Sequence, residues 1–174
     1  MRRRTAVISV LVLVALLLGG SGVSAVRCVV TSECYGTDGA DTLKGTKRVD
    51  FISGLDGSDT IYGFKENDSL YGDDQADTSR DGSDRVDGGP GQDSLIGAGG
   101  DDLLIGGDGR EFIEAREFSS LNPGVDTIKA GDGADIVHAD DGRKDFVDCG
   151  LGGDDVYFDR GKDVLSNCET KHPS

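Results

Sequence analysis

Large apolar residues recur along this chain at intervals of nine, each between polar or small neighbours. The pattern is clearest in residues 54–62, which read GLDGSDTIY: turn-forming residues lead to Asp59, and Ile61 follows two positions later. One apolar residue in nine is too few for an amphipathic helix, which needs three or four in every two turns. Alternation around the apolar position predicts a short strand with that side chain on one face. We therefore expect turns and short strands in regular succession.

The repeated unit has the form G-G-x-G-x-D-x-U-x, where U is a large apolar residue. Further copies occupy residues 88–96, 97–105, 106–114 and 130–138. The acidic sixth position is held by Asp41, Asp50, Asp59, Asp68, Asp77, Asp84, Asp93, Asp102, Glu111, Asp126, Asp135, Asp145, Asp154 and Asp163. The apolar eighth position is held by Leu43, Ile52, Ile61, Leu70, Val86, Leu95, Leu104, Ile113, Ile128, Val137, Val147, Val156 and Leu165.

A short fixed period of this kind is typical of a solenoid. Two units, 18 residues, would form one flattened coil with two facing strands and a turn at each edge. Residues 36–166 then make about seven coils. The apolar residues stack into a narrow seam, and each edge carries carboxylates and turn carbonyls. Irregular spacing near residues 73–83 and 114–123 predicts two loops that leave the roll.

The composition indicates that the chain does not fold by itself. The 174 residues include 28 Gly and 33 Asp or Glu, and the net charge is -15. The excess of acid excludes a nucleic-acid binder, which needs clustered Lys and Arg. High charge with few apolar residues is typical of disordered chains. Something must neutralise the acid before the chain can compact.

The first 25 residues have the three parts of a secretory signal peptide. Arg2 to Arg4 are basic, residues 6–18 are apolar, and Val23-Ser24-Ala25 is a small-residue cleavage site. A membrane anchor is the alternative, but a spanning helix needs about 20 apolar residues. A lipoprotein is disfavoured because Arg27 directly precedes Cys28. We predict cleavage, a secreted protein and no membrane span in the mature chain, which keeps 15 basic and 33 acidic residues.

Export changes how the four cysteines are interpreted, because thiols outside the cytoplasm tend to oxidise in pairs. Cys28 and Cys34 lie in a predicted N-terminal cap, residues 26–35, and Cys168 lies in a predicted tail, residues 167–174. Of the three possible connectivities we favour local pairing, Cys28 with Cys34 and Cys149 with Cys168. A zinc site is disfavoured because it needs clustered Cys or His at short spacing, and neither His138 nor His172 has a cysteine positioned to help.

The carboxylates predict a cation. Two sixth-position residues on one edge would lie about 5 Å apart, where like charges repel strongly unless a cation separates them. Carboxylate and carbonyl oxygens, with no Cys or His in the repeat, suit a hard ion with six to eight ligands. This set favours several Ca²⁺ ions over Mg²⁺, which demands tighter octahedral geometry.

The units at 54–62, 88–96, 97–105, 106–114 and 130–138 resemble the RTX, or hemolysin-type, calcium-binding nonapeptide repeat. The resemblance covers residues 36 to 166 and implies an all-β parallel β-roll, a right-handed β-solenoid with two nine-residue repeats per coil. It further implies that each ion lies between successive turns of one edge. Ions would then be shared by Asp41 with Asp59, Asp84 with Asp102, Asp93 with Glu111, Asp135 with Asp154, and Asp145 with Asp163.

The expected metal ligands are sixth-position carboxylates and carbonyls of the glycine-rich turns. The carboxylates are Asp41, Asp59, Asp84, Asp93, Asp102, Glu111, Asp126, Asp135, Asp145, Asp154 and Asp163. The turn residues are Gly39, Gly57, Gly88, Gly89, Gly91, Gly97, Gly100, Gly106, Gly109, Gly131 and Gly133.

Three turns depart from the pattern, with Arg48, Glu66 and Gln75 in place of the fourth-position glycine. Arg48 and Glu66 stack on one edge, and we expect that edge to bind poorly. Residues 79–111, where the glycines are unbroken, are the best candidates for strong sites. An EF-hand beginning at Asp77 is disfavoured because Gly88 stands where that motif needs Glu.

The predicted function is extracellular calcium binding coupled to folding of the roll. We expect no enzyme, because the chain has no nucleophile elbow, zinc-protease motif or Cys–His pair. The alternative is a secreted surface or interaction protein in which calcium is purely structural. A partner of unknown identity would then bind loop 114–123, through Phe118, or the strand faces.

Overall fold

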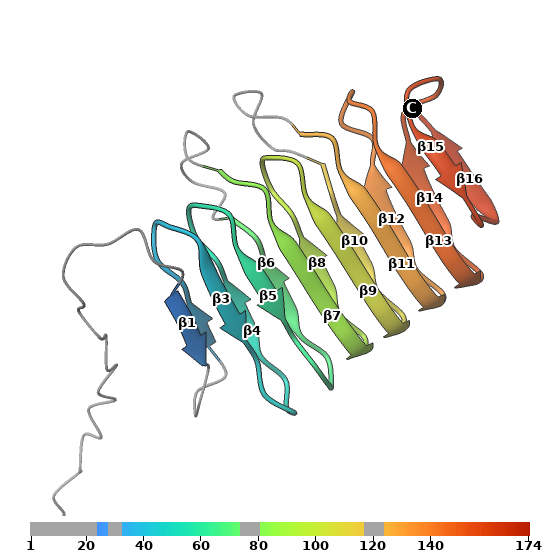
Figure 1. The fold of residues 1–174 in the computed structure, drawn as a ribbon. Coiled ribbons are helices and arrows are strands. Elements are labelled where there is room, and N and C mark those ends of the chain that lie inside the picture. The colour runs from blue at the N-terminus through green and yellow to red at the C-terminus, as the bar shows by residue number, and fades with distance from the viewer. Residues whose placement is uncertain (1–23, 28–32, 74–80, 117–123) are drawn as a thin grey trace, which may run out of the picture.

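The fold is built of short parallel strands in two stacked sheets (Figure 1). The computed structural model describes residues 24–27, 33–73, 81–116 and 124–174. The odd-strand sheet contains β1 (Ser24–Arg27), β3 (Asp41–Lys44), β5 (Thr60–Tyr62), β7 (Arg85–Gly91), β9 (Leu103–Gly109), β11 (Thr127–Gly133), β13 (Phe146–Gly152) and β15 (Val164–Ser166). The even-strand sheet contains β2 (Glu33–Tyr35), β4 (Phe51–Ser53), β6 (Ser69–Tyr71), β8 (Ser94–Ile96), β10 (Phe112–Glu114), β12 (Ile136–Ala139), β14 (Asp155–Phe158) and β16 (Thr170–Pro173).

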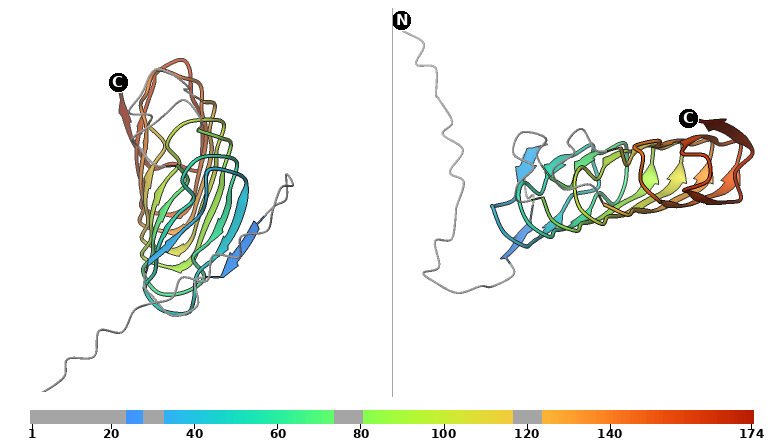
Figure 2. Two further views of the ribbon diagram at one scale, coloured as in Figure 1. Left: turned by 90° about the vertical axis from the view of Figure 1, so that its left-hand side faces the viewer. Right: turned by 90° about the horizontal axis from the view of Figure 1, so that it is seen from above.

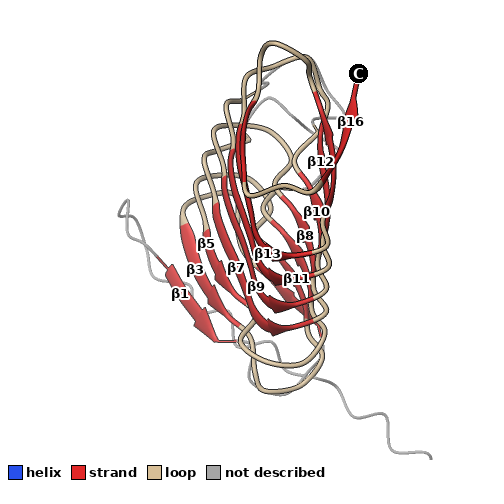
Figure 3. Cartoon of the chain, turned by 90° about the vertical axis from the view of Figure 1, so that its right-hand side faces the viewer, coloured by secondary structure: helices blue, strands red, loops and turns tan. Residues whose placement is uncertain are grey.

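Successive strands alternate between the two sheets, so each coil contributes one strand to each (Figure 3). Strands pair in parallel with the equivalent strand of the next coil, as β3 does with β5. The coils form an elongated spiral with β1 and β16 at opposite ends (Figure 2). The prediction of an all-β parallel roll with two repeats per coil is therefore confirmed. Within the described ranges, no helix is long and apolar enough to span a membrane.

A single-file apolar seam fills the space between the sheets. Each eighth-position residue from Leu43 to Val156 is at most 1 % exposed, and Leu165 packs against them at the end. The strands pair so that these residues stay in line, as Leu43 does with Ile61. A shift by one residue would turn every apolar side chain outward. The predicted seam is confirmed, and it fixes the register that aligns the turns.

Two coils are longer than the rest because their edges contain extra residues. Thr60 pairs with Arg85, 25 residues further on, and Leu103 pairs with Thr127, 24 residues further on. The register therefore makes Asp84, not Asp77, the next sixth-position residue after Asp59 on its edge. The described residues do not include 74–80 or 117–123. Asp77, Gln75 and Phe118 therefore lie outside them.

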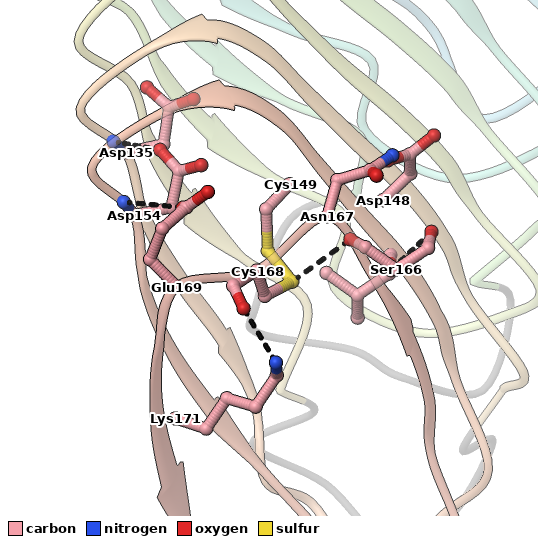
Figure 4. Close-up of a disulfide and its surroundings, with 10 residues drawn as sticks. Asp135, Asp148, Cys149, Asp154, Ser166, Asn167, Cys168, Glu169 and Lys171 are labelled. Carbon is pink, nitrogen blue, oxygen red and sulfur yellow. Dashed lines mark hydrogen bonds between the residues drawn. A yellow bond between two sulfur atoms is a disulfide. The ribbon is translucent and has the colours of Figure 1, made fainter.

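A short last coil forms the C-terminal end of the roll. Residues 170–173, expected in a tail, form β16, which pairs with β14. Cys149 and Cys168 form the predicted disulfide, and the Lys171 Nζ donates a hydrogen bond to the Cys168 carbonyl at 2.5 Å (Figure 4). Lys171 lies beside Val156, in the place of the next seam residue. A charge at the open end of the seam disfavours stacking of another molecule there.

The N-terminal predictions are only partly covered by the described residues. Cys34 is disulfide-bonded and buried, whereas Cys28 lies outside the described residues. Strand β1, Ser24–Arg27, contains the predicted cleavage point after Ala25, and residues 1–23 also lie outside the described residues. The signal peptide stays a prediction.

Candidate metal centre

Acidic side chains form two rows, one along the edge where the chain enters each sheet. The odd row precedes the odd strands and consists of Asp41, Asp59, Asp84, Asp102, Asp126, Asp145 and Asp163. The even row precedes the even strands and consists of Asp50, Asp68, Asp93, Glu111, Asp135, Asp154 and Glu169. Each of these side chains from Asp41 to Asp154 is less than one tenth exposed. Every pair to which the resemblance assigned a shared ion occupies successive coils of one row.

One oxygen of most row carboxylates accepts a hydrogen bond from the backbone of the previous coil. The Asp41 backbone N–H donates to Asp59 Oδ1 at 2.7 Å, and the Asp84 N–H donates to Asp102 Oδ1 at 2.9 Å. The same bond links Asp68 to Asp93 at 2.7 Å in the even row. These bonds continue the parallel ladder one residue beyond each strand. The carboxylates are thus oriented by the backbone before any ion is considered.

The other oxygen of most row carboxylates is buried and has no hydrogen-bond partner in the described part of the chain. These atoms are the Oδ2 of Asp59, Asp68, Asp84, Asp93, Asp102, Asp135, Asp145 and Asp154, together with both oxygens of Glu111. A buried carboxylate oxygen without a partner is costly, so such groups are normally satisfied by a donor, water or a cation. Their repetition along both rows points to one recurrent kind of ligand.

Glycine at the first position of the repeat leaves room beside these oxygens. A Cβ on Gly88 would lie 2.6 Å from Asp93 Oδ2 and 2.7 Å from the Gly106 carbonyl oxygen. A Cβ on Gly54 would likewise collide with Asp59 Oδ2 and the Gly72 carbonyl oxygen. A carboxylate oxygen and a carbonyl oxygen of the next coil therefore converge beside each of these glycines. Any larger residue would fill that cradle.

The turns also depend on left-handed backbone conformations. Gly57 and Gly100 have φ of 108° and 103°, which L side chains rarely adopt. Glu66, expected to spoil its turn, adopts φ of 70° and so keeps the shape that glycine has elsewhere. The predicted turn glycines that share positive φ are Gly57, Gly89, Gly100, Gly109 and Gly131. The other predicted turn glycines are Gly39, Gly88, Gly91, Gly97, Gly106 and Gly133.

Burial raises the pKa of several row carboxylates. It raises the pKa of Asp93 to about 6, of Asp59 and Asp68 to about 7, and of Asp84 to about 8. The pKa of Glu111 rises to about 9, through burial and then the neighbouring Asp135. Desolvation disfavours the charged form of a carboxylate. These groups therefore favour either a proton or a cation.

The donors fit a hard cation held largely by the backbone. Among the described residues, no three His, Cys, Asp or Glu side chains converge closely enough to hold a metal. Each ion would therefore use one or two carboxylates and several turn carbonyls. An all-oxygen set of this kind fits Ca²⁺ and offers nothing to ions that prefer nitrogen or sulfur.

Two acidic residues of the site were missed by the period of nine. Glu169 ends the even row and accepts the Asp154 N–H at 3.3 Å, but it follows Asp154 after only 15 residues. Asp73 is fully buried beside the long turn and accepts the Gly82 N–H at 3.1 Å. Burial raises the pKa of Asp73 to about 9, with Asp84 the next cause. Its position after Gly72 in the repeat gave no acidic signal.

Comparison with known proteins agrees with this geometry. A model of the RTX calcium-binding nonapeptide repeat matches four stretches that together cover more than half of the chain, residues 35–63, 45–79, 79–110 and 122–143. No curated protein matches the chain.

Proposed function

We propose, from the premise that this chain belongs to the family of RTX calcium-binding nonapeptide repeats, that it is an extracellular protein whose roll folds on binding several Ca²⁺ ions. The observation that carries the proposal is the double row of buried carboxylate oxygens without partners. The ligands are the row carboxylates named in the sequence analysis, extended by Asp68 and without Asp41 and Asp163, whose Oδ2 atoms accept hydrogen bonds from the chain, together with the turn carbonyls. When bound, the ions would neutralise the rows.

Coupling of binding to folding follows from the charge. The rows hold like charges in successive coils, and the seam supplies only one large apolar side chain per strand. Such a chain gains too little from burial to offset the repulsion of its carboxylates. Because the cradles exist only in the folded coils, the free energy of ion binding becomes free energy of folding.

An extracellular setting is supported by three features. They are the signal-like N-terminal sequence, the Cys149–Cys168 disulfide and the ligand type. Extracellular calcium modules bind with dissociation constants of about 10⁻⁴ to 10⁻³ M. A chain with that affinity stays empty in the cytoplasm and fills outside the cell.

Substitution of single row residues should lower the number of bound ions. We expect Asp93→Ala and Asp102→Ala each to remove at least one ion, because each loses a carboxylate oxygen that faces a cradle. Isothermal titration calorimetry, in which calcium is added to the metal-free chain, gives the count. Asp108→Ala is the matched control, since it removes one exposed charge from the same coils. An unchanged count in both row variants would refute these ligand assignments.

The metal-free chain should be more stable in acid than at neutral pH. Folded pKa values of about 6 to 9, against 3.8 for Asp and 4.5 for Glu in the unfolded chain, mean that the folded state binds more protons in this window. The free energy of unfolding therefore falls as the pH rises from about 4 to 9. Circular dichroism in chelator should show β-structure near pH 4 and its loss by pH 8. The opposite trend would contradict the burial of these groups.

The alternative of partner binding receives less support. Loop residues 117–123 lie outside the described residues. On the even-strand sheet, the rings of His138, Tyr157 and His172 stack with centroids 4.4 and 4.5 Å apart. Such cross-strand stacking stabilises the sheet by itself and needs no partner. We propose no catalytic role for any residue.

A further inference from the structure

In the first turn of each row, a threonine donates hydrogen bonds to the carboxylate of that row. In the odd row, the Thr37 N–H and Oγ1 donate to Asp41 Oδ2 at 2.6 and 2.8 Å. In the even row, the Thr46 N–H and Oγ1 donate to Asp50 Oδ2 at 2.5 and 3.0 Å. The oxygen left without a partner in the interior turns is therefore satisfied here by threonine.

The backbone at the second position of the repeat separates the two kinds of turn. Interior turns have positive φ at this residue, 77° at Leu55, 84° at Phe64 and 69° at Ala98. Side chains rarely adopt this conformation, so it costs free energy. Glycines with positive φ hold the same place at Gly89, Gly107, Gly131 and Gly150. Thr37 and Thr46 are not among the residues with positive φ, and their N–H groups reach the carboxylate instead.

The fourth position separates the two even-row turns in which glycine is replaced. Arg48 has no positive φ, and its N–H donates to Thr46 Oγ1 at 3.1 Å. Glu66, one coil further along the same row, has φ of 70°. The two departures from glycine therefore differ: Arg48 belongs to a turn that threonine closes, and Glu66 belongs to a turn that leaves Asp68 Oδ2 without a partner.

The far end of the odd row repeats the arrangement. The Asp159 N–H donates to Asp163 Oδ2 at 2.6 Å, across the same four-residue interval as in the threonine turns. Asp163 Oδ1 accepts the Asp145 N–H at 3.0 Å. Both oxygens of the last carboxylate in this row thus have donors from the chain. In the first and last turns of this row, Oδ2 thus accepts from the chain, whereas the Oδ2 atoms of Asp59, Asp84, Asp102 and Asp145 between them have no partner.

We infer that Thr37 and Thr46 close the first coil in place of calcium, and that the calcium sites of the even row begin at Asp68. The inference rests on the proposed function for the interior sites. A coil closed by its own hydroxyls keeps its turn shape before any ion binds. It presents a formed edge, β3 and β4, on which the next coil pairs when the ions arrive. Asp41 keeps one unpartnered oxygen, Oδ1, so Asp50 provides the cleaner test.

The experiment compares Asp50→Asn with Asp68→Asn, which are neighbours in one row and 4 % and 2 % exposed. Calcium bound to the full mature chain is counted by equilibrium dialysis. We expect Asp68→Asn to bind at least one ion fewer and Asp50→Asn to bind the wild-type number. An equal loss in both variants would overturn the inference. Failure of the wild type to bind calcium would refute the proposed function, and the threonine variants then test the closure separately.

Thr46→Val keeps the shape of the side chain and removes the donor hydroxyl, whereas Thr46→Ser keeps the hydroxyl. We expect Thr46→Val to lower the melting temperature by about 3 °C, the effect of losing one capping hydrogen bond in a chain of this size. Thr46→Ser should restore most of this difference, and neither should change the ion count. Melting temperatures of the valine and serine variants that do not differ would overturn the role of Thr46. The comparison can be repeated without calcium near pH 4.

Discussion

Removal of calcium from the mature chain should abolish most of its β-sheet signal in circular dichroism at pH 7.5, and millimolar calcium should restore it. Without ions, folding at this pH must either bury charged carboxylates or make them take up protons that the unfolded chain does not bind, and both cost free energy. The apolar seam is too narrow to offset that cost. We expect a cooperative transition in which β-signal rises with calcium concentration.

Two controls make this result specific. Magnesium at the same concentration should restore much less signal, because it demands octahedral geometry and dehydrates reluctantly. The Cys149–Cys168 disulfide holds the last coils together, so the titration is repeated after reduction. We expect the reduced chain to need more calcium, since the cross-link no longer restricts the unfolded state. Equal β-signal in chelator and in calcium at pH 7.5 would refute coupled folding.

Gly109→Ala should strongly destabilise the roll. Gly109 ends β9 with φ of 153°, and it pairs with Gly91 and Gly133 of the neighbouring coils. A Cβ here would overlap the Gly91 carbonyl oxygen and lie 2.7 Å from Glu111 Oε1. Backbone strain and overpacking together cost roughly 3–5 kcal/mol. Denaturant unfolding at saturating calcium measures the loss.

Gly153→Ala is the matched control for that substitution. Gly153 also lies in a turn next to the end of a strand, but a Cβ on it would meet no atom within 4 Å. Its backbone N–H donates to the Gly133 carbonyl, and alanine keeps that bond. We expect a change within about 0.5 kcal/mol, as is usual for surface substitutions. Similar losses in both variants would show that close coil contact at Gly109 is not the cause.

The fold could be predicted from the sequence because one period carried all of its local signals. The same nine-residue spacing placed glycines in turns, aspartates before strands and apolar residues in the seam. The spacing alone was enough to assign Leu43 and Ile61 to the same line of the apolar seam. The family resemblance agrees with the matched repeat model.

The site was less predictable, because ligands depend on which coil lies next to which. Asp77 continues the period of nine, yet pairing of Thr60 with Arg85 gives its place to Asp84. Glu169 breaks the period and still completes the even row. The irregular spacing located the inserted residues, but strand pairing decided which carboxylates became neighbours across them.

Backbone conformation was also beyond the sequence. Arg48 and Glu66 both replace a glycine, and the sequence predicted the same weakness for both. Only the three-dimensional structure separates them, because Glu66 adopts the left-handed φ of a glycine and Arg48 does not. The hydroxyl of Thr46 takes part in closing the turn that contains Arg48.

The sequence by itself therefore determined the architecture, the excess of acid and the need for a neutralising partner. These properties depend on local periodicity and composition, which can be determined from the sequence without knowing which coils are neighbours. Only the tertiary structure decided which carboxylate oxygens lack a donor and which are closed by threonine. That division depends on the peptide orientation of each turn and on its neighbour one coil away, 15 to 25 residues distant in the chain.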